Sequence, residues 1–170
     1  MITLVLGGTR SGKSAVAEEL AARHGPPVTY VATMVPAGDA DLEARVASHR
    51  RRRNPAWTTV DAGEDLADLL VTLQGTVLVD SLGPWVARAL VSQHAGSNGA
   101  ALCAALGRRR GDTVVVSDEV GMAVHPSTEA GRRFQDALGA VNHAVSAAAD
   151  RVYLVVAGRP LALPGPGSLP

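Results

Sequence analysis

The chain has 170 residues, of which 46% are hydrophobic, and its 16 Lys and Arg residues balance its 16 Asp and Glu residues. This content is enough for one hydrophobic core, so we expect a single domain over residues 1–163 and a flexible tail over residues 164–170. The zero net charge argues against nucleic acid as a partner. The single cysteine excludes an internal disulfide. No apolar run reaches the length that a membrane span needs. We therefore expect a cytoplasmic protein.

Short apolar segments alternate with helix-like segments along the chain. The expected strands are almost continuously apolar, as in a parallel sheet covered on both faces, and they span residues 2–6, 28–33, 57–61, 76–80, 113–117 and 152–157. The expected helices span residues 13–24, 39–53, 64–73, 84–93, 99–110 and 127–149. This order predicts an α/β fold with a mostly parallel sheet flanked by helices. Residues 160–163 are expected to return as a short edge strand, where a proline is tolerated.

The turn after the first expected strand carries the clearest chemical signal. Its sequence GGTRSGKS matches the P-loop pattern GxxxxGK[ST], and it comprises Gly7, Gly8, Thr9, Arg10, Ser11, Gly12, Lys13 and Ser14. A strand precedes the motif and a helix-forming run follows it, which is the context that the motif requires. Backbone N–H groups of such a loop bind phosphate oxygens, the lysine reaches the β- and γ-phosphates, and the Ser hydroxyl is a ligand for Mg²⁺.

A P-loop also needs a carboxylate for the metal shell at the end of a neighbouring buried strand. The segment TVLVD ends at Asp80, and the segment TVVVSDE ends at Asp118 and Glu119. Either strand can lie beside the first one, so the sequence leaves the choice between these carboxylates open. Asp80, together with Ser14, is our first prediction for the Mg²⁺ site.

One histidine stands out from the other four. Leu42, Val46 and His49 are spaced at i, i+4 and i+7, so a helix would place His49 on its apolar face, followed by Arg50, Arg51, Arg52 and Arg53. A neutral imidazole there could attack the α-phosphate of a nucleotide, with the arginines binding the triphosphate. From the residues alone, a core histidine followed by a solvated basic helix end is the favoured explanation of the pattern.

Six segments, taken in order, resemble the bifunctional adenosylcobinamide kinase and adenosylcobinamide-phosphate guanylyltransferase family. They are GGTRSGKS, YVAT, EARVASHRRRR, VLVDSLGPWV, SDEVGMAVHP and RRFQDALGAVNHAVSAAADRVYLVVAG, and together they extend over nearly the whole chain. A P-loop is shared by many enzymes, whereas EVGM followed by the last segment is much more specific.

The resemblance implies two reactions. In the first, ATP or GTP phosphorylates the aminopropanol hydroxyl of adenosylcobinamide. In the second, GTP guanylylates a histidine, here His49, and the phosphorylated corrinoid takes up the GMP to give adenosylcobinamide-GDP. The resemblance further implies a RecA-like sheet and a homotrimer.

The resemblance also implies which residues contact nucleotide. These are the P-loop residues already named, Thr33, Met34 and Val35, the four arginines from Arg50 to Arg53, Asp61 and Asp80. Lys13 and His49 are the implied catalytic residues.

Two other functions compete with this interpretation. A monofunctional P-loop kinase for another small metabolite shares the loop and the arginines but needs no inward-facing histidine. A GTP-dependent switch usually carries an Asn-Lys-x-Asp element, which this chain lacks because Lys13 is its only lysine.

Overall fold

The computed structural model describes the chain except residues 35–46, 48–52, 64, 93–97, 166 and 168–170. Most of the helix expected over residues 39–53, with Val35, His49 and Arg50 to Arg52, and most of the expected tail lie outside the described residues.

Seven strands form one sheet in the order β3-β2-β4-β5-β1-β6-β7. The strands are β1 (Ile2–Gly7), β2 (Val28–Ala32), β3 (Thr58–Asp61), β4 (Thr76–Asp80), β5 (Thr113–Asp118), β6 (Arg151–Val156) and β7 (Arg159–Leu163). The first six pair in parallel, and β7 pairs antiparallel with β6 at the edge. The mostly parallel sheet and its C-terminal edge strand are therefore confirmed.

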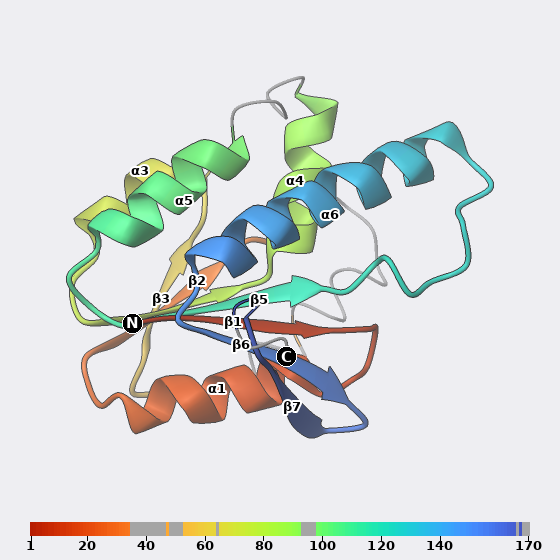
Figure 1. Ribbon diagram of the computed structural model, residues 1–170. Coiled ribbons are helices and arrows are strands. Elements are labelled where there is room, and N and C mark those ends of the chain that lie inside the picture. The colour runs from red at the N-terminus through yellow and green to blue at the C-terminus, as the bar shows by residue number, and fades with distance from the viewer. Residues whose placement is uncertain (35–46, 48–52, 64, 93–97, 166, 168–170) are drawn as a thin grey trace.

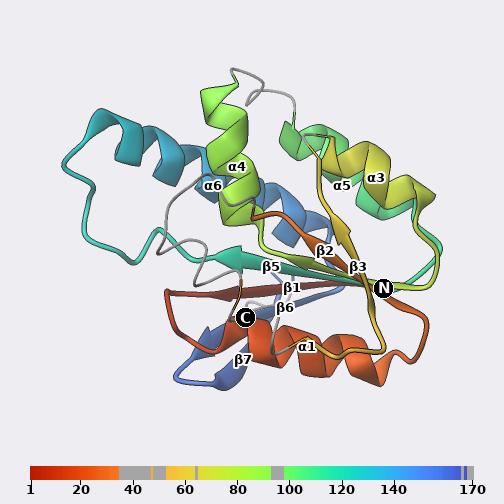
Figure 2. The same cartoon turned by 180° about the vertical axis from the view of Figure 1, so that it is seen from behind.

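Helices cover both faces of the sheet, in unequal numbers. They are α1 (Lys13–Arg23), α3 (Leu66–Thr72), α4 (Leu82–Val91), α5 (Asn98–Arg108) and α6 (Glu129–Ala148). Figures 1 and 2 show α1 alone on one face and the other four on the opposite face. No helix within the described ranges is long and apolar enough to cross a bilayer.

Apolar residues on both sides of the central strands explain this layering. Along β4, Val77 and Val79 belong to the core cluster beneath α3 to α6, whereas Leu78 packs in the cluster on the α1 side. Side chains of a strand point alternately to opposite faces, so an uninterrupted apolar run supplies both cores. All three side chains are fully buried.

Strand β3 departs from the expectation of strands covered on both faces, whereas β7 is the edge strand that the sequence predicted. Thr58 and Thr59 of β3 are exposed, as are all five residues of β7. Each of these strands has a neighbour on one side only, so fewer helices reach it. Polar and short edge strands are also the usual protection against pairing with other chains.

The starts of α4 and α6 each differ by two residues from the sequence prediction, for a physical reason in each case. Helix α4 begins at Leu82, two residues before the expected Pro84, because a proline is tolerated in the first turn, where backbone N–H groups have no intrahelical partner. Helix α6 begins at Glu129, two residues later than expected, after Thr128 caps it by accepting a hydrogen bond from the Gly131 N–H.

Arg109 fastens together three segments at the amino-terminal end of the sheet. Its guanidinium donates hydrogen bonds to the carbonyl oxygens of Leu70, Leu73 and Gly75 at 2.7–2.8 Å, and to the Thr113 hydroxyl at 2.9 Å. These acceptors lie in α3, in the loop before β4 and at the start of β5. Burial lowers the pKa of Arg109 from its ordinary value.

We predict that Arg109→Met destabilises the fold, because it leaves several carbonyl groups without their charged donor. The expected loss in free energy of unfolding is about 2–4 kcal/mol, measured by urea denaturation. The matched control is Arg108→Met, since Arg108 is exposed and, within the described ranges, bonds only to the Ala104 carbonyl of its own helix. A loss of equal size in both variants would show that Arg109 has no such role.

Candidate active site

The loop between β1 and α1 has the backbone form of a phosphate-binding turn. Gly12 adopts a left-handed conformation with φ of 90°, and α1 begins at the next residue, Lys13. The loop is closed by a hydrogen bond from the Ser11 N–H to the Gly8 carbonyl at 3.1 Å. The β6–β7 turn supports it from outside, because the Gly158 N–H donates to the Ser11 carbonyl at 2.7 Å.

Asp80 ends β4 and reaches the start of α1. The Ser14 hydroxyl donates a hydrogen bond to Oδ1 of Asp80 at 3.2 Å, and the Tyr30 hydroxyl donates to Oδ2 at 2.6 Å. Asp80 is only 8% exposed. Two neutral donors therefore hold this carboxylate in a fixed orientation beside the loop.

The contact with Asp80 also affects the pKa of the Tyr30 hydroxyl. Burial raises its pKa above the ordinary value, and the charge of the Asp80 carboxylate and its hydrogen bond raise it further. The Arg53 guanidinium acts in the opposite direction, and its Cζ lies 3.9 Å from the centre of the Tyr30 ring. Tyr30 thus remains a hydrogen-bond donor to Asp80 well beyond neutral pH.

Asp118 ends β5, the strand between β1 and β4, and contacts a different loop residue. The Lys13 ammonium lies 2.7 Å from Oδ1 of Asp118 and donates a longer hydrogen bond of 3.3 Å to the Gly8 carbonyl. The Lys13 side chain is 12% exposed and that of Asp118 is 32% exposed. The two carboxylates between which the sequence could not choose therefore have different partners.

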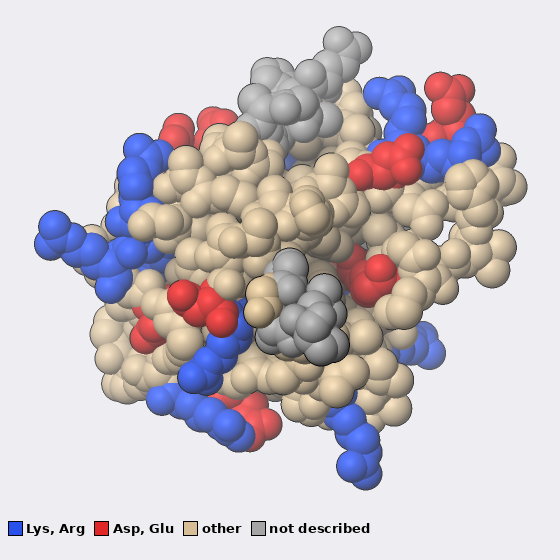
Figure 3. Space-filling model, viewed as in Figure 1, with Lys and Arg blue, Asp and Glu red and all other residues tan. Residues whose placement is uncertain are grey.

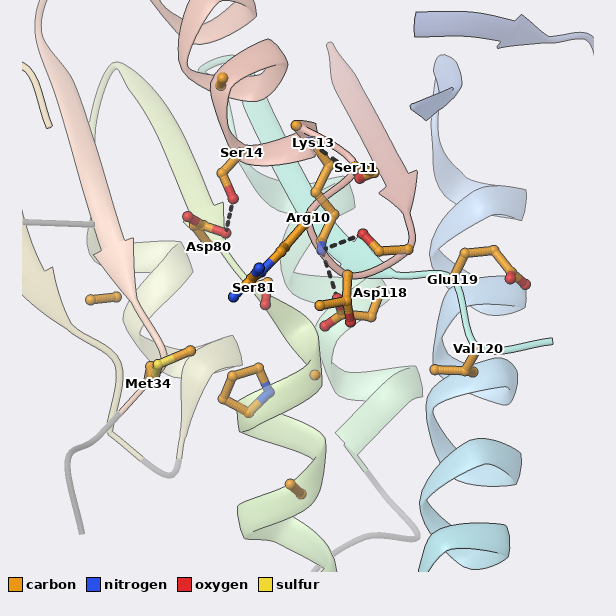
Figure 4. Close-up of a pocket in the computed structure, with 18 of the residues that line it drawn as sticks. Arg10, Ser11, Lys13, Ser14, Met34, Asp80, Ser81, Asp118, Glu119 and Val120 are labelled. Atoms are coloured by element: carbon orange, nitrogen blue, oxygen red, sulfur yellow. Dashed lines mark hydrogen bonds and ion pairs between the residues drawn. The ribbon is translucent and has the colours of Figure 1, made fainter. Parts of the chain in front are cut away.

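A cavity of about 910 Å³ joins these groups (Figure 4). Among the predicted nucleotide-contacting residues that the structure describes, all except Gly7 and Thr33 line it. The lining ones are Gly8, Thr9, Arg10, Ser11, Gly12, Lys13, Ser14, Met34, Arg53, Asp61 and Asp80. The fold thus brings together segments that are far apart in the sequence.

Thr33 has a structural contact instead. It is 1% exposed, its hydroxyl donates to the Ser81 carbonyl at 2.5 Å, and the Ser81 N–H donates to that hydroxyl at 3.0 Å. These bonds fasten the end of β2 to the start of α4.

Arg53 is the one residue of the arginine run that the structure describes. It lines the cavity, and its buried Nε has no hydrogen-bond partner within the described part of the chain. A cation in this position can pair with a phosphate group.

The donor set beside the loop fits a magnesium ion. Ser14 and Asp80 offer a hydroxyl and a carboxylate oxygen, the ligand types that Mg²⁺ prefers. Across the described ranges no three His, Cys, Asp or Glu residues form a group that could hold a metal. This agrees with the usual mode of Mg²⁺ binding, in which one or two protein ligands combine with substrate phosphates and waters.

The sequence analysis missed Tyr30 and much of the cavity wall. A signal for Tyr30 was present, since a tyrosine within an otherwise apolar buried strand needs a partner for its hydroxyl. The unpredicted lining residues come mainly from α4, the loop after β5 and α6, and they include Ser81, Gly83, Pro84, Ala87, Val120, Met122, Ala123 and Phe134. Most of these residues lie in segments that carry the family resemblance, but small and apolar side chains have no chemical pattern that would assign them to a cavity.

The pH dependence of stability in the Tyr30→Phe variant tests the contact between Tyr30 and Asp80. In the unfolded chain tyrosine loses its proton near pH 10, whereas the folded protein keeps Tyr30 protonated to higher pH. The contribution of the Tyr30 hydroxyl to the free energy of unfolding is therefore fully present below about pH 10. It falls as pH rises, by about 1.4 kcal/mol between pH 9 and pH 11. We expect urea denaturation to show this component in the wild type and its absence in Tyr30→Phe.

Tyr153→Phe is the control for that measurement, because the Tyr153 hydroxyl has no hydrogen-bond partner among the described residues. It should keep the wild-type pH dependence. An unchanged alkaline loss in Tyr30→Phe would contradict the buried contact.

The charged surface gives no sign of a nucleic-acid site on the face drawn in Figure 3. Basic and acidic side chains are interspersed around its outline, and other residues fill most of its centre. Binding to the phosphate backbone of nucleic acid depends on a gathered basic surface.

Comparison with known proteins agrees with the geometry. A family model described as "Cobinamide kinase / cobinamide phosphate guanyltransferase" matches residues 3–163. The chain is 40% identical over 174 residues to the bifunctional adenosylcobalamin biosynthesis protein CobP of Pseudomonas aeruginosa, which covers 97% of this chain and 98% of that protein. It is 34% identical over 178 residues to the corresponding protein CobU of Escherichia coli K12, covering 93% and 97%.

A solved structure of a prototypical ATPase from the type III secretion system of pathogenic bacteria has the same fold. Its TM-score is 0.59 at 12% identity, and the match covers 90% of this chain but only 50% of that one. This likeness concerns the fold alone, and it agrees with the mostly parallel α/β sheet expected from the sequence. Because a family model and two relatives above 30% identity each extend over nearly the whole chain, the chain belongs to the cobinamide kinase / cobinamide phosphate guanyltransferase family.

Proposed function

We propose that this protein is a bifunctional transferase of cobalamin biosynthesis. It phosphorylates adenosylcobinamide with ATP or GTP, and it then transfers GMP from GTP through a guanylyl-histidine to form adenosylcobinamide-GDP. The observation that carries the proposal is the convergence of Lys13, Ser14 and Asp80 on one cavity, in a chain that matches this family over residues 3–163.

The kinase step depends mainly on positioning and charge neutralisation. The loop N–H groups and Lys13 bind the β- and γ-phosphates, and Lys13 leaves its contact with Asp118 to do so. Ser14 and Asp80 would hold Mg²⁺, which when bound neutralises phosphate charge. The hydroxyl of adenosylcobinamide then attacks the γ-phosphorus in line. The protein positions the reactants and takes little covalent part in this step.

The guanylyl step uses His49 as a nucleophile. Its imidazole attacks the α-phosphorus of GTP, pyrophosphate leaves, and the phosphate of adenosylcobinamide phosphate displaces the histidine in turn. Support comes from the sequence pattern around His49 and from Arg53, four residues further on, which lines the cavity. Dividing the reaction in two avoids the direct approach of two large anions.

The proposed assembly is a homotrimer and the proposed location is the cytoplasm. Both rest on the family resemblance. The site residues are proposed with the roles given above.

Lys13→Ala is expected to lower kcat/KM for both reactions by at least about 100-fold, because the transferred phosphates lose their charged partner. The measurements are ADP release with adenosylcobinamide and conversion of the phosphorylated product with GTP. Arg23→Ala, at the exposed end of the same helix, is the control and should leave both rates unchanged. Near-normal rates in Lys13→Ala would rule out the proposed phosphate site.

His49→Ala is expected to abolish guanylylation and spare the kinase reaction. Incubation with α-labelled GTP followed by a denaturing gel should label the wild type with an acid-labile, base-stable adduct and leave the variant unlabelled. His143→Ala is the control, since His143 lies exposed on α6. An unlabelled wild type with kinase activity would instead indicate a monofunctional P-loop kinase.

A further inference from the structure

The cavity has a second part that the nucleotide roles above do not use. Six residues form what we call the apolar wall, namely Pro84 and Ala87 of α4, Val120, Met122 and Ala123 after β5, and Phe134 of α6. Met122 is a large apolar side chain that is 72% exposed, so it is accessible to a molecule bound in the cavity. A nucleoside triphosphate held at the loop would not use such a surface to bind its phosphates.

Asp118 lies where the apolar wall meets the phosphate loop. In Figure 4 it lies between Asp80 and Val120. Oδ1 pairs with Lys13 at 2.7 Å, and Oδ2 faces Gly83 in the first turn of α4. A Cβ atom on Gly83 would come within 2.6 Å of that oxygen, so only a glycine permits the carboxylate to sit there.

The chain around Asp118 is held firmly by α6. The Asn142 amide donates to the Asp118 carbonyl at 2.9 Å, and the Gln135 amide donates to the Val120 carbonyl at 2.6 Å. Between them, the Glu119 carboxylate accepts hydrogen bonds from two backbone N–H groups at 2.9 Å. The carboxylate and the adjacent wall are therefore positioned before any ligand binds.

Three other carboxylates line the cavity: Asp61 ends the edge strand β3, which is far from β1 in the strand order, and Asp80 and Glu119 are already engaged. Both oxygens of Asp80 accept hydrogen bonds, from Ser14 and Tyr30, and both oxygens of Glu119 accept from the backbone. Asp118 has one ion pair, with Lys13, which a bound nucleotide would draw away toward its phosphates. Nucleotide binding would thus release a carboxylate at the boundary of the apolar wall.

We propose that the apolar wall is the acceptor subsite of the kinase reaction and that Asp118 accepts the proton of the acceptor hydroxyl. The proposal rests on the kinase function proposed above, and it assigns to the subsite an alcohol carried by a bulky molecule that presents an apolar face to the wall. The hydroxyl oxygen forms a bond to the γ-phosphorus, and the bond from that phosphorus to the β–γ bridging oxygen breaks. Its electron pair leaves with the nucleoside diphosphate, and the hydroxyl proton passes to Asp118 and then to water.

The Asp118→Asn variant tests whether Asp118 accepts the proton of the acceptor hydroxyl. With adenosylcobinamide and ATP, kcat should fall by about 10²–10³-fold, while the Kd for a fluorescent ATP analogue stays within about twofold. A parallel fall in nucleotide affinity would mean that Asp118 only positions Lys13, and an unchanged kcat would mean that it has no role. Either result would overturn the assignment.

Ala87→Trp tests the subsite without touching the carboxylate. The indole would occupy the space beside the wall, so KM for adenosylcobinamide should rise at least about tenfold at unchanged nucleotide affinity. Ala104→Trp, at an exposed position of α5, is the matched control. An unchanged KM in Ala87→Trp would refute the subsite, whereas a wild type that does not phosphorylate adenosylcobinamide would refute the proposed function itself.

Discussion

The Asp80 carboxylate is the group around which the site is organised. A buried carboxylate is costly unless its oxygens accept hydrogen bonds, and here Ser14 and Tyr30 supply a donor to each of them. The two donors come from opposite directions, one from the start of α1 and one from β2. Satisfying this single charge therefore fixes the phosphate loop relative to the neighbouring strands.

The strand order assigns different tasks to two otherwise similar acids. Since β5 lies between β1 and β4, Asp118 at its end comes next to Lys13, whereas Asp80 reaches across to Ser14. One carboxylate is thereby placed for the metal shell and the other for the boundary with the apolar wall. Parallel strands make this possible because their carboxyl ends meet at one edge of the sheet.

The opposite edge of the sheet has a different chemistry. There Arg109 binds three backbone carbonyl groups of α3 and the loop before β4, together with the Thr113 hydroxyl of β5. A cation that satisfies carbonyl groups stabilises loops without creating a reactive site. The contacts of Arg109 that stabilise the fold and the candidate active site thus lie at opposite ends of the same strands.

Much of the fold could be predicted from the sequence because its signals are local. Uninterrupted apolar runs such as TVLVD indicate strands buried on both faces, and GGTRSGKS indicates a strand, a phosphate turn and a helix in order. Boundaries were less accurate at α4 and α6, where a tolerated proline and a capping threonine decide the first turn. The exposure of β3 could not be predicted, since it depends on which strands become edges, whereas the proline in β7 had already indicated an edge strand.

The sequence by itself determined the P-loop, the two carboxylates that follow buried strands, and the family to which the pattern belongs. Only the tertiary structure decided that Asp80 faces Ser14, that Asp118 faces Lys13, and that Tyr30 and the apolar wall share their cavity. The physical reason is that a motif encodes contacts between residues close in the chain. Partners that lie 50 or 66 positions apart meet only through the order in which the strands pair.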